Sequence, residues 1–277
     1  MARGPDTLLK NLIWRLTFRR SDARVIFVVG APRSGTTLMK TILLAHSDVT
    51  GVMWETTGIL GFENLFCQSN WTNKVFSKED VQGLLAESRC IVDFYERYVC
   101  RYCANFGTPY FVDKLWPHNG RLKFAFRRFP NAHFVHIFRD GRDCYCSARS
   151  NRQIPQGRSL RSYASLWSRS MRACADLSQS SRMVGVRYEE LVTEPPRVVK
   201  SIMHTLGLPF EPSQVKPHGY SETTYLSSLS LHGKLDKPIS ADSVGKYRGQ
   251  MTDEAIRRFE KLAGDELRRY GYGVAHR

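Results

Sequence analysis

Four short apolar runs without polar alternation are spaced along the chain, and each predicts a buried strand. They cover residues 25–29, 110–112, 133–138 and 183–186. Segments able to form helices separate them, at residues 36–46, 121–128, 159–177 and 196–206. Strands that are apolar on both faces are typical of a parallel sheet covered on both sides, so the expected fold class is α/β, with a central, mostly parallel sheet flanked by helices. The loops after the strands should then share the edge where α/β proteins bind ligands.

Two further helices are predicted by polar residues at their starts. Ser77 precedes Glu79 and Asp80, and Thr252 precedes Asp253, so acidic side chains would complement the positive end of each helix dipole. After Thr252 the apolar residues recur every three or four positions, which predicts a stripe facing the core. Its members are Ile256, Phe259, Leu262, Ala263, Leu267 and Tyr270.

The length of 277 residues suffices for one substantial core, and a single domain over residues 1–277 is expected. It would begin with a basic N-terminal segment at residues 1–22. Residues 209–241 show no hydrophobic period and are expected to form a long loop region that could serve as a lid. No run approaches the ~18 apolar residues of a membrane span, and polar residues interrupt the apolar patch at residues 8–16, which argues against a signal peptide.

The charge and the cysteine content limit the classes of binding partner and the cell compartments that fit this chain. Lys and Arg number 41 against 26 Asp and Glu, a formal charge of +15, which predicts an anionic partner without choosing among nucleotide, nucleic acid, lipid or acidic acceptor. The seven irregularly spaced cysteines favour reduced thiols and a cytoplasmic location. Cys100 and Cys103 have the spacing of a metal site but lie in an apolar, helical stretch. We therefore expect them, like Cys144 and Cys146, to be buried structural thiols, and we expect no metal.

The strongest local signal is the sequence GAPRSGTT at residues 30–37, directly after the first strand. Backbone N–H groups in such a turn converge on one point, and the helix that follows adds positive potential, which makes an anion site. Its two glycines match the frame of a nucleotide-binding P-loop, which predicts a P-loop-containing fold. However, Thr36 stands where the P-loop lysine would be, Thr37 fills the Ser/Thr position, and the cation has moved into the turn as Arg33. This favours an anion other than a metal-bound triphosphate.

The sequence PRSGTT at residues 32–37 resembles the 5'-phosphosulfate loop of sulfotransferases that use 3'-phosphoadenylyl sulfate (PAPS). The likeness is closest to the tyrosylprotein sulfotransferases and their bacterial relatives. It continues over residues 30–49, over residues 131–147 with their Arg-Asp-Gly-Arg motif, over residues 186–192 and over residues 237–247. These blocks in family order imply a sulfotransferase that takes PAPS as donor and releases 3'-phosphoadenosine 5'-phosphate (PAP) without a metal.

The same resemblance implies which residues hold the 5' end of the donor. Ser34, Gly35, Thr36 and Thr37 would bind the 5'-phosphate and the sulfate, and Arg33 would neutralise their charge. The alternative is an ordinary glycine-rich turn between a strand and a helix.

A second set of residues is implied for the rest of the nucleotide. Arg139 would pair with the 3'-phosphate, Ser147 would hydrogen-bond to it, Lys246 would be a late contact, and Tyr188 would lie near the adenine. The family carries an arginine four residues after the serine, and Arg152 is expected to replace it here. The alternatives are a surface ion pair for Arg139, which would contribute little, and a core position for Tyr188.

The resemblance also implies a set of catalytic residues. Glu55 stands where the family has its catalytic glutamate and would take the proton of the acceptor hydroxyl; the alternative is a solvated loop carboxylate. Lys114 matches a lysine that stabilises the departing bridging oxygen, and Arg33 would assist it. Asp113 is expected to be a structural partner, and Ser230 could replace a missing family serine only with a shifted register.

The acceptor is the least defined part of the prediction. The branch resemblance implies a tyrosine phenol on an acidic peptide, with a carbohydrate or small-metabolite hydroxyl as the alternative. A small-molecule P-loop kinase is a more remote alternative, disfavoured by the missing loop lysine. A basic nucleic-acid-binding module is another, supported only by the net charge.

Overall fold

The computed structural model describes the chain in five stretches, which together include every element discussed below. They are residues 5–52, 75–117, 120–151, 154–216 and 238–274.

Helices separate the strands along the chain, as predicted. The helices are α1 (Pro5–Leu16), α2 (Thr36–Leu44), α3 (Lys78–Glu87), α4 (Ile91–Phe106), α5 (Arg121–Arg128), α6 (Gly141–Arg149), α7 (Leu160–Ala175), α8 (Tyr188–Thr193), α9 (Pro195–Leu206), α10 (Tyr247–Gln250) and α11 (Asp253–Arg269), with the 3-10 turns η3 (Pro155–Arg158) and η4 (Pro212–Val215). The strands are β1 (Val25–Val29), β2 (Val49–Thr50), β3 (Tyr110–Leu115), β4 (His133–Phe138) and β5 (Met183–Arg187).

The five strands form a sheet in the order β2-β3-β1-β4-β5. β2 pairs with β3 and β4 pairs with β5, both in parallel, with Val135 opposite Val184 in the second pair. β1 is buried along its whole length, as expected of a strand covered on both faces. The predicted α/β fold with a parallel sheet flanked by helices is therefore confirmed. The prediction missed β2, which has only two residues and no apolar run of its own.

The chain divides into two compact units. Unit 1 comprises residues 1–27, 47–115 and 119–133, and unit 2 comprises residues 28–46, 116–118 and 134–277. The expectation of one domain over the whole chain stays a prediction.

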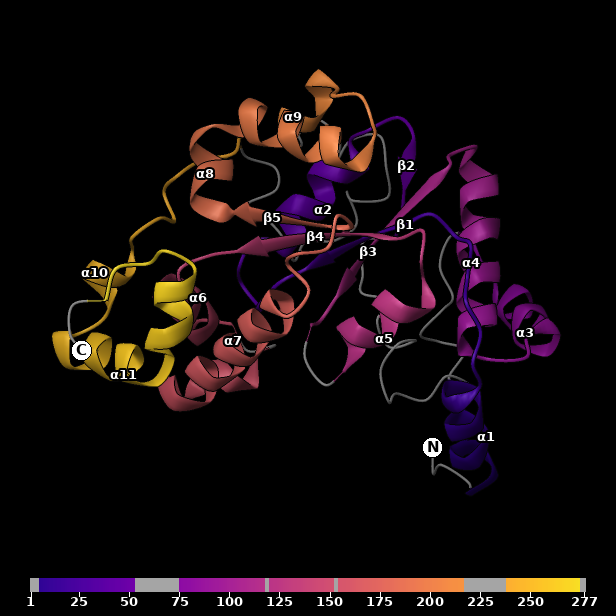
Figure 1. Ribbon diagram of the computed structural model, residues 1–277, viewed down its shortest axis with the longest axis horizontal. Helices are drawn as coiled ribbons and strands as arrows, with labels where there is room; N and C mark the ends of the chain where they lie inside the picture. The colour runs from indigo at the N-terminus through magenta and orange to yellow at the C-terminus, as the bar shows by residue number, and fades with distance from the viewer. Residues whose placement is uncertain (1–4, 53–74, 118–119, 152–153, 217–237, 275–277) are drawn as a thin grey trace. The chain divides into compact units, whose positions relative to one another are not determined.

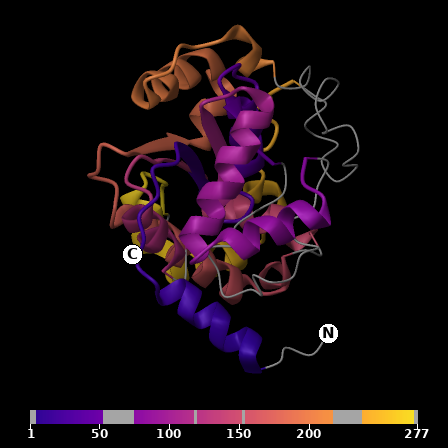
Figure 2. The same cartoon turned by 90° about the vertical axis from the view of Figure 1, so that its right-hand side faces the viewer.

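Unit 1 is built around the aromatic face of α4. Tyr95 and Tyr98 are fully buried, and Tyr98 stacks on Phe76 with ring centroids 4.6 Å apart. Tyr102 meets Phe111 of β3 edge to face at 5.4 Å. Such aromatic contacts fix the helix on the sheet more specifically than burial alone would. By contrast, α1 projects from the rest of unit 1 (Figures 1 and 2).

In unit 2, α8 and α9 lie on one side of β4 and β5, and α7 and α11 lie on the other (Figure 1). The second side contains a hydrophobic cluster with Trp167 and Phe259 fully buried. Gly141, the first residue of α6, has to be a glycine because an added Cβ would lie 2.8 Å from the Trp167 ring and 2.9 Å from Phe259. The predicted stripe on α11 is confirmed except at Leu262, which is 40% exposed.

The cysteines follow their predicted role only in part. All six cysteines in the described residues are free thiols. Cys144 is buried, as predicted, but Cys100 is exposed and Cys103 and Cys146 are half-buried, so the expectation of a buried thiol was wrong for Cys100. Burial raises the pKa of the Cys103 thiol to about 11, which keeps that thiol protonated and unreactive.

Two further observations concern membrane-spanning helices and the predicted loop region. None of the helices in the described stretches combines the length and the apolar character needed to cross a membrane. The predicted loop region 209–241 contains η4, whereas residues 217–237 lie outside the described residues. Its role as a lid therefore stays a prediction.

Candidate functional site

The turn between β1 and α2 has an unusual backbone that only certain residues permit. An added Cβ at Gly30 would lie 2.4 Å from the carbonyl oxygen of Ile137, so the turn can approach β4 only through a glycine. Gly35 has φ 102°, a left-handed conformation that glycine adopts without strain. Arg33 has φ 71° and is the only residue other than glycine with a positive φ in the described part of the chain. Such strained residues concentrate at ligand sites.

The same turn ends at the start of a helix that no side chain caps. Gly35 is the N-cap of α2, and it has no side chain to accept from the N–H groups of the first turn. Those N–H groups have no acceptor within the helix, and the helix dipole makes their surroundings positive. Thr36 and Thr37 are half-buried at this end. The Ser34 hydroxyl is fully buried and has no hydrogen-bond partner among the described residues. The turn therefore has the donors of an anion site.

Arg33 connects the turn to α6. Its side chain is exposed, and its Nε donates a 3.0 Å hydrogen bond to Oγ of Ser147. The guanidinium of Arg33 in the turn and the hydroxyl of Ser147 in α6 are thus in direct contact.

Arg139 follows directly after β4 and is 6% exposed, which rules out the surface ion pair considered above. Its guanidinium lies 4.6 Å from the centre of the Tyr188 ring and donates to the carbonyl oxygens of Arg33, at 3.4 Å, and of Ser243. Asp143 is 3.8 Å away, too far for a strong pair. Arg139 Nε is buried and unpartnered among the described residues, so one donor of this cation is available to a ligand.

The backbone of Arg139 is held from the core side. Trp167 Nε1 donates a 3.2 Å hydrogen bond to the carbonyl oxygen of Arg139. The neighbouring Asp140 does not pair with Arg139, because its carboxylate accepts from Nε of Arg142 at 3.0 Å and from the terminal nitrogen at 2.7 Å. Arg142 also bonds to Glu260 of α11. Asp140, Gly141 and Arg142 of the Arg-Asp-Gly-Arg motif therefore have structural roles, and Arg139 is the member that contacts the anion turn.

Tyr188 begins α8 and packs against the turn. An added Cβ at Gly35 would lie 2.6 Å from Cδ2 of Tyr188, so the ring and the glycine are in direct contact. The ring is 9% exposed, and burial raises the pKa of its phenol. The two interpretations of this residue are thus compatible, because Tyr188 is largely buried while its ring borders the turn and Arg139.

Lys246 is exposed, and a buried carboxylate fixes the segment that carries it. Asp143 of α6 accepts from the backbone N–H of Gly245 at 2.7 Å and of Tyr247 at 2.9 Å, on both sides of Lys246. Burial raises the pKa of Asp143, more than these hydrogen bonds lower it. One carboxylate thereby connects the Arg139 region with the Lys246 segment.

Glu189 is a second carboxylate link in unit 2, and it is half-buried. It accepts from the backbone N–H of Asp140 at 3.0 Å and from the phenol of Tyr272 at 3.0 Å. Burial is the largest influence on the Glu189 carboxyl and raises its pKa. Asp140, next to Arg139, and Glu189, next to Tyr188, are therefore hydrogen-bonded to each other, which restrains the distance between the two candidate side chains.

Lys114 and Asp113 lie in unit 1, near the end of β3. Lys114 is 9% exposed, and Asp113 is 1% exposed. Asp113 accepts from the phenol of Tyr95 at 3.0 Å and from the backbone N–H of Lys114 at 2.7 Å. These bonds agree with the structural role expected of Asp113.

Comparison with known proteins decides the family. The model of the sulfotransferase family matches residues 25–212, which is more than half of the chain. The chain belongs to the sulfotransferase family. The predictions of the family, of an enzyme and of PAPS as the donor are thereby confirmed.

The relatives agree with this assignment. The protein-tyrosine sulfotransferase of Drosophila melanogaster is 27% identical over 261 residues, which cover 86% of this chain and 50% of the fly protein, so the chain spans half the length of that relative. The sulfotransferase domain of the Synechococcus PCC 7002 olefin synthase has the same fold, with a TM-score of 0.70 at 20% identity over 94% of this chain and 99% of that domain. A mouse sulfotransferase, SULT7A1, solved in complex with PAP, has a TM-score of 0.57 at 14% identity and covers 95% and 91% of the two chains.

Three residues predicted for the sulfotransferase site lie outside the described residues, namely Glu55, Arg152 and Ser230. Sequence reasoning also missed two residues that support the site, Asp143 and Glu189. Asp143 follows the Arg-Asp-Gly-Arg motif directly, and a carboxylate next to a motif arginine is a signal that could have suggested it. Glu189 gave no such signal, because one glutamate at a helix start resembles any other.

Proposed function

We propose that this sulfotransferase moves the sulfuryl group of PAPS to the phenol of a tyrosine in an acidic peptide. The observation that carries the proposal is the arrangement within unit 2 of a positive-φ turn, an uncapped helix start and the buried cation Arg139. These features suit a nucleotide with anionic groups at two ends.

The turn suits the 5' end of the donor. The N–H groups of Gly35, Thr36 and Thr37 bind the 5'-phosphate and the sulfate, with the threonine hydroxyls as further donors. The buried, unpartnered hydroxyl of Ser34 fits such a ligand, because an unsatisfied buried donor costs free energy until a partner arrives. Arg33 is exposed and can move to the sulfate by exchanging its bond to Ser147.

The other end of the site suits a 3'-phosphate. Arg139 supplies a buried guanidinium with an unpartnered Nε, which is a strong donor to phosphate oxygens. Ser147 adds a hydroxyl, and Lys246 adds a charge from the segment that Asp143 holds. Tyr188 offers an aromatic edge for the adenine. Arg152 is proposed as a further cation, by resemblance.

The chemistry needs a base and a way to neutralise the leaving oxygen. PAPS, when bound, supplies the sulfuryl group and leaves as PAP. Glu55 takes the proton of the attacking phenol while the new S–O bond forms and the bond to the bridging oxygen breaks. Lys114 and Arg33 stabilise the negative charge on that bridging oxygen. These three roles rest on the family resemblance and on the chemistry of the residue types.

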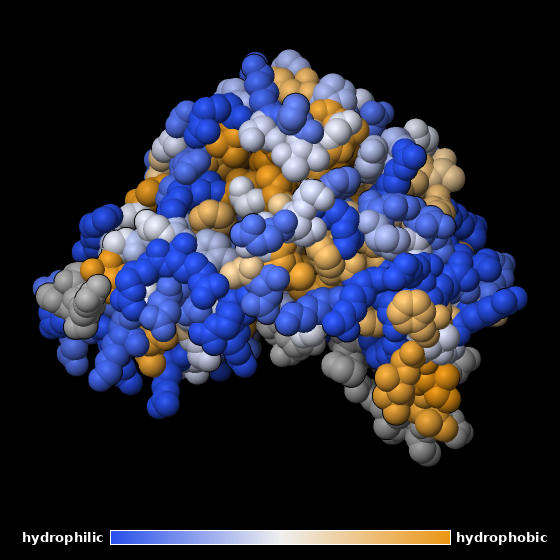
Figure 3. Space-filling view, viewed as in Figure 1, coloured by the Kyte–Doolittle hydropathy of each residue, from blue (hydrophilic) through white to orange (hydrophobic). Residues whose placement is uncertain are grey.

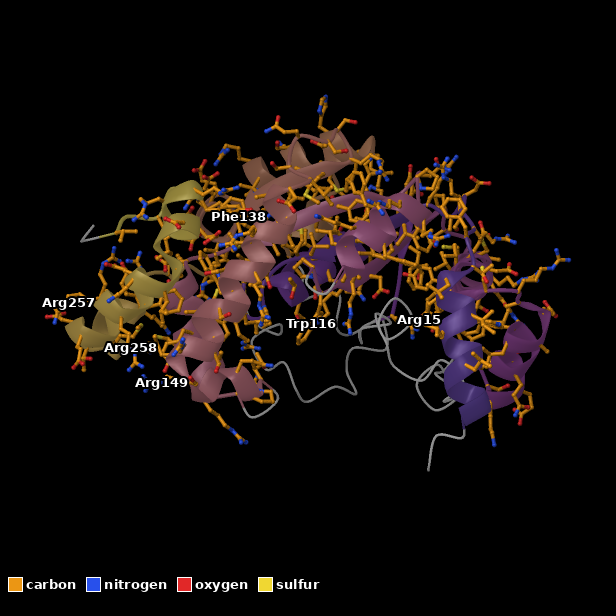
Figure 4. The ribbon with its side chains drawn as sticks, turned by 60° about the horizontal axis from the view of Figure 1, so that its bottom comes forward. Arg15, Trp116, Phe138, Arg149, Arg257 and Arg258 are labelled. Atoms are coloured by element: carbon orange, nitrogen blue, oxygen red, sulfur yellow. The ribbon has the colours of Figure 1, made fainter. Side chains whose placement is uncertain are left out.

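A tyrosine acceptor is supported by two observations. Curated relatives that match most of this chain bear the name protein-tyrosine sulfotransferase. On the surface of unit 2, Arg149, Arg257 and Arg258 also gather on one side (Figure 4). Both Arg149 and Arg258 act electrostatically on Tyr145, so they lie near each other. Basic residues of this kind favour the approach of an acidic peptide.

The decisive experiment incubates the protein with ³⁵S-labelled PAPS and an acidic peptide that contains one tyrosine. Label should enter this peptide, but neither the same peptide with Tyr→Phe nor one with its acidic residues changed to amides should be labelled comparably. Labelling of glycans or small phenols with no labelling of the peptide would overturn the acceptor proposal. Thermal stabilisation by PAP but not by ATP–Mg²⁺ is expected, and the reverse result would favour a kinase.

A cytoplasmic location is a further part of the proposal. It is supported by the free thiols of the six described cysteines, which reducing compartments preserve. Fractionation of cells that express the protein, with thiol labelling before and after reduction, tests it. Recovery from a secretory or periplasmic fraction, or formation of disulfides, would contradict it.

A further inference from the structure

The helix α1 presents an apolar stripe to solvent. Leu9, Leu12, Ile13 and Leu16 are 57%, 49%, 53% and 70% exposed, and their spacing of three and four residues puts them on one face of the helix. Phe18, 69% exposed, is two residues beyond the end of the helix. Figure 3 shows these side chains as an orange patch at the lower right, where Figure 1 draws α1. Isolated exposed apolar residues need no explanation, but a contiguous patch marks an interaction surface.

The apolar stripe is exposed although α1 is packed against the rest of unit 1. Trp14, on the opposite face of α1, is 6% exposed. After the helix, Arg19 pairs with Asp93 at 3.3 Å and with Glu96 at 2.8 Å, both on α4. Arg128 of α5 donates to the carbonyl oxygen of Thr17 at 3.3 Å. The helix is thus attached to unit 1 by one face while its apolar stripe is left uncovered.

Basic residues border the stripe. From residue 12 to residue 21 the sequence has no Asp or Glu but has Arg15, Arg19 and Arg20. Arg19 is paired with the two carboxylates of α4, so Arg15 and Arg20 supply the charge beside the stripe, and the one acidic residue of α1, Asp6, is near its start. Arg15 projects from α1 in Figure 4. Phe18 lies between two cations, with Arg128 4.2 Å and Arg20 6.0 Å from its ring centre. The surface is therefore apolar in its middle and positive at its edges.

We propose that α1 and Phe18 bind the surface of a membrane that contains anionic lipids. An amphipathic helix with leucine, isoleucine and aromatic side chains on one face and arginines beside them is suited to the boundary between acyl chains and headgroups. The apolar stripe inserts among the acyl chains, and Arg15 and Arg20 contact the anionic headgroups. The site is a surface for a lipid bilayer and is independent of the sulfuryl-transfer site proposed above.

The length of α1 and the charge beside its apolar stripe favour the surface of a bilayer over a membrane span or a second copy of the chain. At 1.5 Å per residue the 12 residues of α1 extend about 18 Å, which is less than the ~30 Å of the hydrocarbon core, so the helix lies on the membrane and does not span it. A second copy of the chain would cover the stripe only by bringing two sets of arginines together, which like-charge repulsion disfavours. An anionic bilayer complements both the apolar middle and the positive edges.

The test is cosedimentation of the full chain with lipid vesicles. Binding to phosphatidylcholine vesicles that contain phosphatidylserine should exceed binding to pure phosphatidylcholine by about tenfold or more, and added salt should weaken it. The double variant Leu12→Gln/Leu16→Gln should lose this binding. Arg15→Gln/Arg20→Gln should lose most of the preference for the anionic vesicles. The control Leu262→Gln changes an exposed leucine on α11 and should bind as the unchanged protein does.

Other outcomes overturn the proposal. Equal binding by Leu12→Gln/Leu16→Gln and the unchanged protein would show that the stripe is not the lipid contact. Absence of vesicle binding would do the same, and sedimentation equilibrium would then show whether those substitutions separate a dimer that uses α1. Because all four substituted side chains lie on or beside an exposed face, circular dichroism and PAP binding should stay unchanged in every variant, and vesicle binding can be compared directly.

Discussion

The Nε of Arg33 donates a 3.0 Å hydrogen bond to Oγ of Ser147. By resemblance these two residues serve opposite ends of the nucleotide, the sulfate and the 3'-phosphate, yet within unit 2 they bind each other. The bond connects the turn to α6, so the two parts of the proposed donor site are in direct contact. In the donor complex proposed above, both groups exchange this bond for bonds to phosphate and sulfate oxygens, which are stronger because the acceptor is charged.

Ser147→Ala should therefore weaken PAP binding while leaving the fold intact. A hydrogen bond to a charged group contributes about 1.5–3 kcal/mol, which corresponds to a roughly 10- to 100-fold higher Kd for PAP. Isothermal titration with PAP measures the change. The matched control is Ser150→Ala, because the exposed Ser150 lies one turn on, and its hydroxyl bonds only to the backbone oxygen of Ser147 among the described residues. Equal PAP affinity in the two variants would remove Ser147 from the site.

Gly35→Ala should damage both the fold and the site. The left-handed φ of 102° costs a residue with a Cβ about 1–3 kcal/mol, and the added Cβ would also lie 2.6 Å from the buried Tyr188 ring. We expect the thermal midpoint to fall by roughly 5 °C or more and PAP to give little stabilisation. Thermal unfolding with and without PAP measures both effects.

The control for this glycine is Gly83→Ala in α3, where an added Cβ meets nothing within 4 Å and φ is not positive. That substitution should stabilise the protein by about 0.5–1 kcal/mol, because alanine is the better helix former. If Gly35→Ala were as stable as Gly83→Ala, the conformation of the turn described above would be wrong.

The fold was predictable where one local pattern decides an element. The apolar runs at β1 and β4 and the caps Ser77 and Thr252 gave correct elements, because burial and capping are local properties. The failures had non-local causes. β2 exists only because it pairs with β3, and Leu262 is exposed although it fits the helical period, since no element of the described stretches covers it. The residues next to an element in the sequence do not show which distant elements pack against it.

For the candidate site, the sequence suggests residue types but not contacts. The turn sequence and the Arg-Asp-Gly-Arg motif identify Arg33 and Arg139 without any structure. The sequence does not show that Asp140 pairs with Arg142, so that Arg139 is left to contact the turn. Arg142 is also held by Glu260, which is 118 residues away along the chain. Long-range polar networks of this kind are what the sequence leaves undetermined.

Asp143→Asn tests whether a buried carboxylate positions Lys246. The carboxylate accepts from two backbone N–H groups, of Gly245 and Tyr247, and an amide can accept with only one of its two terminal atoms. One buried N–H then loses its partner, at a cost of about 1–3 kcal/mol. We expect faster hydrogen exchange at Gly245 and Tyr247 together with weaker PAP binding.

Asp242→Asn is the control for this change, because Asp242 is exposed and lies in the same segment. It should leave both hydrogen exchange and PAP affinity unchanged. Faster exchange in Asp143→Asn without any loss of PAP affinity would contradict a role of the Lys246 segment in nucleotide binding.

Glu55→Ala should abolish turnover without affecting the donor site. General base catalysis contributes roughly 10²–10⁴-fold to the rate, so sulfuryl transfer should fall by that factor while the Kd for PAP stays the same. Initial rates with ³⁵S-labelled PAPS and titration with PAP measure the two quantities. Glu79→Ala, at the exposed start of α3, controls for the loss of a carboxylate. Near-normal rates in Glu55→Ala would show that another group accepts the proton.

His136 should make the stability of the protein depend on pH. It is fully enclosed in β4, 3% exposed and edge-on to the Tyr270 ring at 5.7 Å, and its Nε2 has no partner among the described residues. Burial lowers the pKa of this imidazole to about 3. The unfolded chain takes up a proton near the ordinary pKa of about 6.5, so between these values the unfolded state binds more protons than the native state. Stability should therefore fall as the pH drops below about 6.5.

His136→Leu should reduce this dependence. Between pH 7 and pH 5 the protonation of this histidine in the unfolded state accounts for about 2 kcal/mol, so the loss of unfolding free energy over that range should be smaller by about that amount in the variant. Urea unfolding at both pH values measures the difference, and contributions of the carboxyl groups cancel between the two proteins. His204→Leu, at an exposed position of α9, should retain the slope of the unchanged protein. If His136→Leu retained it as well, His136 would have to be protonated or exposed in the native state, and the tight packing of β4 against Tyr270 would have to be revised.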